Sequence, residues 1–211
     1  MPIVTAIKQQ KRSQLRYNIY LDGRYSFALS DLDLSASEVR VGQSLSVEEV
    51  AAYQRQAETD QFFALAVRFV GYRPRSRQEI EAYLGRKGAD AEEAGTVIGR
   101  LAKMGLANDA DFAASWVASR QILRPRSKRQ LEQELRAKGV SREDIGGALG
   151  QLDGEAEFEM VLALTRKKYR LPQYRQTEKL AGYLARQGYS YDLVKRAVAQ
   201  VMGEEVNSDL Q

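Results

Sequence analysis

The chain contains an internal repeat of sixteen residues, and this repeat constrains the fold more than any other feature. RPRSRQEIEAYLGRKG at residues 73–88 is followed by RPRSKRQLEQELRAKG at residues 124–139. A diverged third copy ends at Gly188. Similarity at a fixed period indicates supersecondary units that stack on their neighbours. We therefore expect a tandem array of similar units.

One apolar pattern is written three times when the copies are aligned on Gly88, Gly139 and Gly188. Apolar residues stand eight and four positions before each glycine, and six, nine, ten and thirteen positions after it. This spacing predicts two helices joined at a glycine, which readily adopts the left-handed conformation that ends many helices. A further apolar stripe precedes each pair, so each unit should hold three short helices. Because such small units bury little apolar surface alone, we expect stacked neighbours to share their cores.

The first sixty residues follow a different pattern. Residues 17–29 alternate aromatic and aliphatic side chains around Asp22-Gly23, which is a strong signal for a β-hairpin. Residues 3–7 could add a third strand, with the basic segment 8–16 as a loop between strands. A short helix is expected over residues 46–53, where the spacing of Ser46 and Glu49 predicts a capping box.

These patterns predict a mostly α-helical fold with a small β-hairpin unit in front. The expected divisions are a hairpin unit with a short helix at residues 1–61, three-helix repeats at residues 62–110, 111–157 and 158–203, and a frayed tail at residues 204–211.

The repeated RPRS text has a partly structural explanation. Pro74 and Pro125 should end the preceding helix, because proline disfavours helical dihedral angles in the residue before it. Ser76 stands three residues before Glu79, and Ser127 three residues before Gln130, so both serines should begin capping boxes. The arginines need another reason, because cations at a helix N-terminus are mildly unfavourable with the helix dipole.

Three clusters of basic residues fall in register in the three units. Each is a solvated helix end when considered alone, but three in register favour a shared anionic partner, since cations and free amides at a helix start bind phosphate or carboxylate. The candidate contact residues are Arg73, Arg75, Arg77, Arg124, Arg126, Lys128, Arg129, Arg166, Lys167, Lys168, Arg170 and Arg175.

The composition argues against an enzyme. The chain has no Cys and no His, which excludes thiol chemistry and histidine catalysis and argues against a zinc site, and it lacks a phosphate-binding P-loop motif. The paired carboxylates at residues 92–93 and 143–144 fit the first turns of helices. We expect no cofactor and no metal. The absence of Cys and of a long apolar segment favours a cytoplasmic protein without a membrane partner. We expect a monomer.

The chain resembles the regulatory protein RecX family, which modulates the RecA recombinase. The similar segments are YNIYLDGRYSFALS, RPRSRQEIEAYLGRKG, LEQELRAKGVSREDI and EKLAGYLARQGYSYDLVKRAV. The resemblance implies an array that inserts along the groove of the RecA–DNA filament. It also implies inhibition of RecA ATP hydrolysis, strand exchange and co-protease activity, and hence modulation of recombination and the SOS response.

A stand-alone DNA-binding array is the alternative, because three short helices with a basic element could be a helix-turn-helix variant. A regulator of the filament would contact DNA, single- or double-stranded, weakly or through the filament. A stand-alone DNA-binding protein would contact DNA directly. Trp116 and the tyrosines of the third unit could stack on bases, although the helical spacing of Trp116 favours a place in the core.

Overall fold

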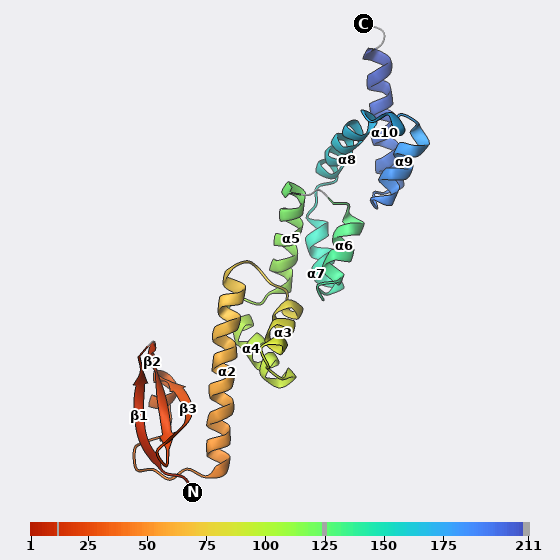
Figure 1. The fold of residues 1–211 in the computed structure, drawn as a ribbon. Coiled ribbons are helices and arrows are strands. Elements are labelled where there is room, and N and C mark those ends of the chain that lie inside the picture. Colours follow the sequence, from red (N-terminus) through yellow and green to blue (C-terminus); the bar gives the residue numbers. More distant parts are fainter. Residues whose placement is uncertain (12, 124–125, 209–211) are drawn as a thin grey trace. The chain divides into compact units, whose positions relative to one another are not determined.

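The computed structural model describes residues 1–11, 13–123 and 126–208, and it is mostly helical with a small antiparallel sheet near the N-terminus (Figure 1). The predicted fold class is confirmed. The chain forms two compact units, Met1–Arg73 with Ile80–Leu106, and Pro74–Glu79 with Ala107–Gln211. By its contacts, the RPRS segment of the first copy therefore belongs mainly with the second and third helical repeats.

The sheet consists of β1 (Val4–Gln10), β2 (Ser13–Leu21) and β3 (Arg24–Ser30), paired antiparallel in chain order. The turn between β2 and β3 contains Asp22 with φ of 47° and Gly23 with φ of 80°. Positive values at both central residues are typical of the tight turns that match the twist of a hairpin. The predicted hairpin is confirmed at this turn.

The basic segment 8–16 is mostly strand, so its prediction as a loop was wrong. Lys8 pairs with Asn18, and Gln9 pairs with Tyr17, so β1 continues to Gln10. Polar residues can occupy these positions because the ladder needs only their backbone groups, and one face of an antiparallel sheet can remain in water.

One face of the sheet is covered by the following segment. Phe27 stacks on Tyr53 of α2 (Val47–Gly71), with ring centroids 5.3 Å apart. A three-stranded sheet needs such a cover to bury an apolar face. A short helix that the sequence analysis did not predict, α1 (Asp31–Ala36), begins at the capping residue Ser30. The buried cluster contains Val4, Ile19, Leu21, Phe27, Leu29, Val39, Leu45 and Ala57.

Helix α2 (Val47–Gly71) is much longer than the predicted short helix. Its capping box is confirmed, with the Glu49 N–H donating to Ser46 Oγ and the Ser46 N–H donating to Glu49 Oε2. The helix passes Tyr53 because no Pro or Gly interrupts it before residue 71. It buries Ala57 under the sheet and Ala66 in the first repeat, so the expected division between residues 61 and 62 falls inside it.

The remaining helices occur in the predicted groups of three. The first and third long helices of each group pack together, α2 with α4, α5 with α7, and α8 with α10. The bounds are α3 (Arg77–Arg86) and α4 (Ala91–Lys103); α5 (Asp109–Leu123), α6 (Lys128–Arg136) and α7 (Arg142–Gly150); and α8 (Gly154–Tyr169), the 3-10 helix η1 (Pro172–Tyr174), α9 (Thr177–Arg186) and α10 (Tyr191–Ser208).

The three aligned glycines end helices α3, α6 and α9 as predicted. Gly88, Gly139 and Gly188 have φ of 99°, 75° and 84°. After each glycine, the next N–H donates to the carbonyl of the leucine four positions before the glycine, at 3.1 to 3.4 Å. This bond satisfies a carbonyl that the helix end would leave without a partner.

The cores of the second and third repeats are separate, so the expectation that neighbours share their cores was wrong for this pair. The second cluster includes Phe112, Leu131 and Ile145, and the third includes Phe158 and Leu180, each drawn from one repeat. The contacts between these repeats include a hydrogen bond from Ser127 Oγ to the Gln187 carbonyl and the ion pair of Lys128 with Glu157, which are polar.

Helix α10 extends to Ser208, whereas the sequence analysis placed a frayed tail from residue 204. Residues 204–208 are therefore helical. Glu204 accepts hydrogen bonds from Arg166 of α8 and from Gln200, and these contacts support the extra helical turn beyond Gly203.

Candidate partner-binding surface

In the cationic cluster at the start of α3, Arg77 forms hydrogen bonds within the chain. The backbone N–H of Arg77 donates to Asp109 Oδ1 at 2.8 Å, and Arg77 Nε donates to the carbonyl of Ala107 at 3.4 Å. A helix N-terminus favours a carboxylate, and Asp109 supplies one. Of the other predicted contact residues here, Arg73 is exposed and Arg75 is half-buried.

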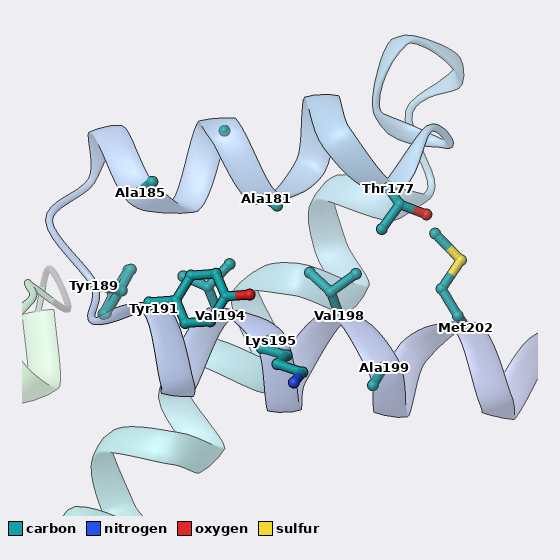
Figure 2. Close-up of a pocket in the computed structure, with 11 residues that line it drawn as sticks. Thr177, Ala181, Ala185, Tyr189, Tyr191, Val194, Lys195, Val198, Ala199 and Met202 are labelled. Carbon is teal, nitrogen blue, oxygen red and sulfur yellow. The ribbon is translucent and has the colours of Figure 1, made fainter.

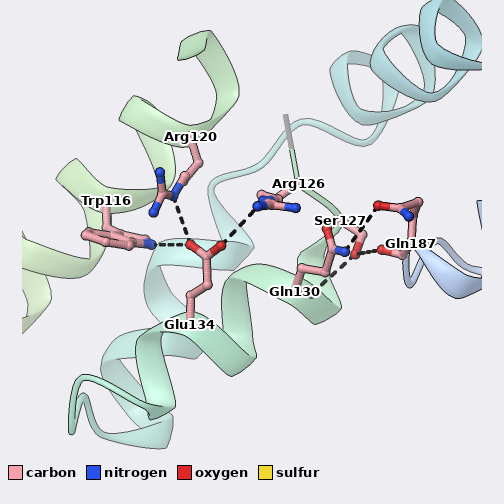
Figure 3. Close-up of polar contacts among 7 residues, drawn as sticks. All are labelled: Trp116, Arg120, Arg126, Ser127, Gln130, Glu134 and Gln187. Carbon is pink, nitrogen blue, oxygen red and sulfur yellow. Dashed lines mark hydrogen bonds and ion pairs between the residues drawn. The ribbon is translucent and has the colours of Figure 1, made fainter. Parts of the chain in front are cut away.

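Arg126 of the second cluster faces the carboxylate of Glu134 (Figure 3). Glu134 Oε2 accepts hydrogen bonds from Trp116 Nε1 at 2.8 Å and from Arg120 Nε at 2.9 Å. Arg126 Nε lies 3.4 Å from Glu134 Oε1, at ion-pair distance but without hydrogen-bond geometry. Arg120 and Lys138 lie over the Trp116 ring, 4.4 and 4.6 Å from its centroid. Trp116 is thus engaged within the protein, as its helical spacing predicted.

Lys128, the next cation of this cluster, is also paired. Its Nζ lies 3.3 Å from Glu157 Oε2 on α8, and the Glu157 side chain is only 9% exposed. Arg129 is exposed, and the described part of the chain offers it no ion-pair partner. Arg124 and Pro125 lie outside the described residues. Among the described cations of the second cluster, Arg129 is therefore the one most available to an external anion.

The serines of both RPRS copies are fully buried caps. Ser76 Oγ accepts from the Glu79 N–H at 3.1 Å, and Ser127 Oγ accepts from the Gln130 N–H at 3.2 Å. Ser127 Oγ also donates to the carbonyl of Gln187 at 2.7 Å (Figure 3). The Gln130 amide points to the Gln187 side chain at 3.5 Å and does not close the predicted capping box.

The third cluster divides into engaged and exposed cations. Arg166 donates two hydrogen bonds to the carboxylate of Glu204, one from Nε at 3.0 Å. These bonds raise the pKa of Arg166 and lower the pKa of Glu204. Lys168 Nζ lies 4.8 Å from the ring centroid of Tyr183 and 5.8 Å from that of Tyr174. Arg166 and Lys168 are therefore already engaged within the third repeat.

Lys167, Arg170 and Arg175 remain exposed at the end of α8 and after η1. Among the described residues, none provides an ion-pair partner for these three cations. They are the predicted contacts of the third repeat that best suit a phosphate or an acidic side chain.

A polar hollow in the same repeat adds two cations that the sequence analysis missed. It has a volume of about 490 Å³ and is lined by Gln173, Tyr174, Glu178, Lys179 and Arg186. Lys179 and Arg186 lie on α9, beyond the cluster at the end of α8. Both lie within the diverged third copy, where Arg186 stands at the position of Arg86 in the first copy.

An apolar groove of about 550 Å³ lies between α9 and α10 of the third repeat (Figure 2). Tyr189 and Tyr191 lie at one end of it and Met202 at the other. Ala181 lines the groove at the position where the earlier repeats carry Glu81 and Glu132, so the groove is more apolar than the equivalent faces. Burial raises the pKa of the Tyr189 hydroxyl above its ordinary value.

The described residues contain no cluster of acidic side chains suited to a metal ion. The paired carboxylates that the sequence analysis considered lie in the first turns of helices. Glu93 forms a capping box with Asp90, and Asp144 pairs with Ser141. This arrangement agrees with a structural role for both pairs.

Family models match four successive parts of the chain. They are the regulatory protein RecX N-terminal domain at residues 2–46, and the first, second and third three-helix domains of RecX at residues 63–101, 108–149 and 155–198. The chain belongs to the regulatory protein RecX family.

Relatives match across most of this RecX-family chain. Regulatory protein RecX of Bacillus subtilis is 30% identical over 205 residues, covering 95% of this chain and 78% of that protein. Regulatory protein RecX of Mycolicibacterium vanbaalenii is 38% identical over 156 residues, covering 69% and 85%. A crystal structure of regulatory protein RecX superposes with a TM-score of 0.80 at 26% identity, covering 92% of this chain and 98% of that one.

Membership of the RecX family implies a regulator of RecA. The RecX family is not known as an enzyme family. No helix in the described ranges combines the length and the apolar character needed to cross a bilayer.

Proposed function

We propose that this RecX-family protein binds along the groove of the RecA–DNA filament and inhibits RecA ATP hydrolysis, strand exchange and co-protease activity. In this way it would modulate recombination and the SOS response in the cytoplasm. It acts as a monomer, without a cofactor and without catalysis of its own. The observation that carries the proposal is the match of all four RecX domains in order along the chain.

The exposed cations of the third repeat support a docking surface for an anionic partner. Lys167, Arg170 and Arg175 are solvent-exposed, whereas Arg126, Lys128 and Arg166 face carboxylates of the same chain. A filament presents phosphates and acidic side chains, which attract unpaired cations more strongly than paired ones. We expect the exposed set to contribute most of the charge-dependent affinity.

A titration of RecA ATPase activity on single-stranded DNA tests the proposal. We expect the rate of ATP hydrolysis to fall as the protein approaches the RecA concentration, with no hydrolysis by the protein alone. A rate that stays unchanged at saturating protein would contradict the proposed function.

The triple variant Lys167→Ala, Arg170→Ala, Arg175→Ala tests the surface. We expect the concentration for half-inhibition to rise about tenfold or more, since one charge-assisted contact contributes about 1.5–3 kcal/mol. The matched control replaces three exposed cations elsewhere, Arg55, Lys103 and Arg142, and should inhibit like the wild type. Equal inhibition by both variants would place the contact outside the third cluster.

The alternative, a stand-alone DNA-binding protein, predicts a different result. Such a protein would retard bare duplex DNA without RecA, and its affinity would fall steeply with salt. Binding of bare DNA at the concentrations that inhibit RecA would favour this alternative.

A further inference from the structure

The starts of α3 and α6 contact the second and third repeats in the same way. A Cβ atom on Gly139 would lie 2.8 Å from the side chain of Gln78, and one on Gly188 would lie 2.8 Å from Ser127 Oγ. A Cβ atom on Gly88, the first glycine of the series, would meet nothing within 4 Å. The start of α3 therefore packs against the glycine turn of the second repeat, and the start of α6 packs against that of the third.

Equivalent positions form the polar contacts at both turns. Glu79 and Gln130 stand at the same position of their copies, and so do Lys138 and Gln187. The first pair is an ion pair, with Lys138 Nζ 2.7 Å from Glu79 Oε1. The second is an amide contact, with Gln130 Nε2 3.5 Å from Gln187 Oε1.

The residue after each capping serine reaches the beginning of the next opening helix. Arg77 binds Asp109, the first residue of α5, through its backbone N–H. Lys128 pairs with Glu157, in the first turn of α8. Glu157 is almost buried, so Lys128 neutralises a carboxylate that would otherwise be costly to remove from water.

The third copy lacks these features. Gln176 replaces the serine and makes no capping hydrogen bond with its side chain, and Thr177 replaces the cation that follows.

We propose that the start of α6, at Ser127 and Lys128, is a joint that holds the third repeat against the second, with the pair Lys128–Glu157 as its charge contact. The joint gives a structural role to the serine and the following cation of the second copy. When the pair is broken, the third repeat moves independently of the second.

Distance measurements between two spin labels test the joint in the full-length protein. The chain has no Cys, so Gly147→Cys on α7 and Ala199→Cys on α10, both exposed, would carry the only labels. We expect one narrow distance distribution in the otherwise wild-type chain and loss of that narrow distribution in Lys128→Met. The charge-swapped variant Lys128→Glu with Glu157→Lys should restore it.

The matched control is Arg136→Met, which removes the ion pair with Glu132 on the exposed side of the same helix. It should leave the distance distribution unchanged. A narrow distribution in Lys128→Met would overturn the proposed joint. Failure of the charge swap to narrow the distribution would overturn the role of the charge pair, and this readout stays decisive if Lys128→Met folds poorly.

Discussion

At the scale of single residues, a capping serine can also form a hydrogen bond to a neighbouring repeat. Ser127 caps α6 and donates to the Gln187 carbonyl, whereas the exposed Ser141 caps α7 and pairs only with Asp144 in its own first turn. Loss of a cap costs about 1 kcal/mol, and loss of a further hydrogen bond costs about 1 kcal/mol more. We therefore expect Ser127→Ala to lower the free energy of unfolding by about 2 kcal/mol in urea denaturation.

Ser141→Ala is the control for this prediction, because it removes a cap without an inter-repeat contact. It should cost about 1 kcal/mol. Equal losses for the two variants would show that the Gln187 hydrogen bond adds nothing to stability.

At the scale of elements, the glycine turns differ in how closely a neighbour approaches. Left-handed backbone conformation costs a non-glycine residue about 1–2 kcal/mol, and this applies to Gly88→Ala. Gly188→Ala should cost more, because its new Cβ atom would lie 2.8 Å from Ser127 Oγ. Thermal or urea unfolding of the two variants measures the difference. A similar loss of stability in both would mean that the turn of the third repeat is not in close contact with α6.

At the scale of the whole molecule, destabilisation of one repeat should affect only the elements that contact that repeat. Leu135→Ala removes a fully buried side chain from the core of the second repeat and should cost about 2–5 kcal/mol. Hydrogen exchange should then accelerate in α5–α7 and at the Gln187–Gly188 turn. The sheet β1–β3 lies in the other compact unit and should keep its protection. Faster exchange across the sheet as well would show that the chain unfolds as one cooperative body.

Much of the architecture could be predicted because its signals are local. The three apolar stripes, the Asp22-Gly23 turn and the glycines that end helices all depend on residues a few positions apart. The length of α2 was missed because its second half was assigned to the opening helix of the first three-helix repeat. No local signal in the sequence shows that a single helix packs on both the sheet and that repeat. The polar strand residues near Lys8 were missed because strand pairing on a solvated edge leaves little apolar pattern.

The sequence by itself determined the repeat, the order of helices and strands, and the residue types at each cationic cluster. Only the tertiary structure decided which cations are paired. Lys128 meets Glu157 on a helix of the next repeat, and Arg166 meets Glu204 across 38 residues. The physical reason is that charge interactions depend on distance in space, and a capping motif specifies the local backbone but not the carboxylate that folding brings to it. The same reason separates the exposed Lys167, Arg170 and Arg175 from the engaged Arg166, although all four lie in one short stretch of sequence.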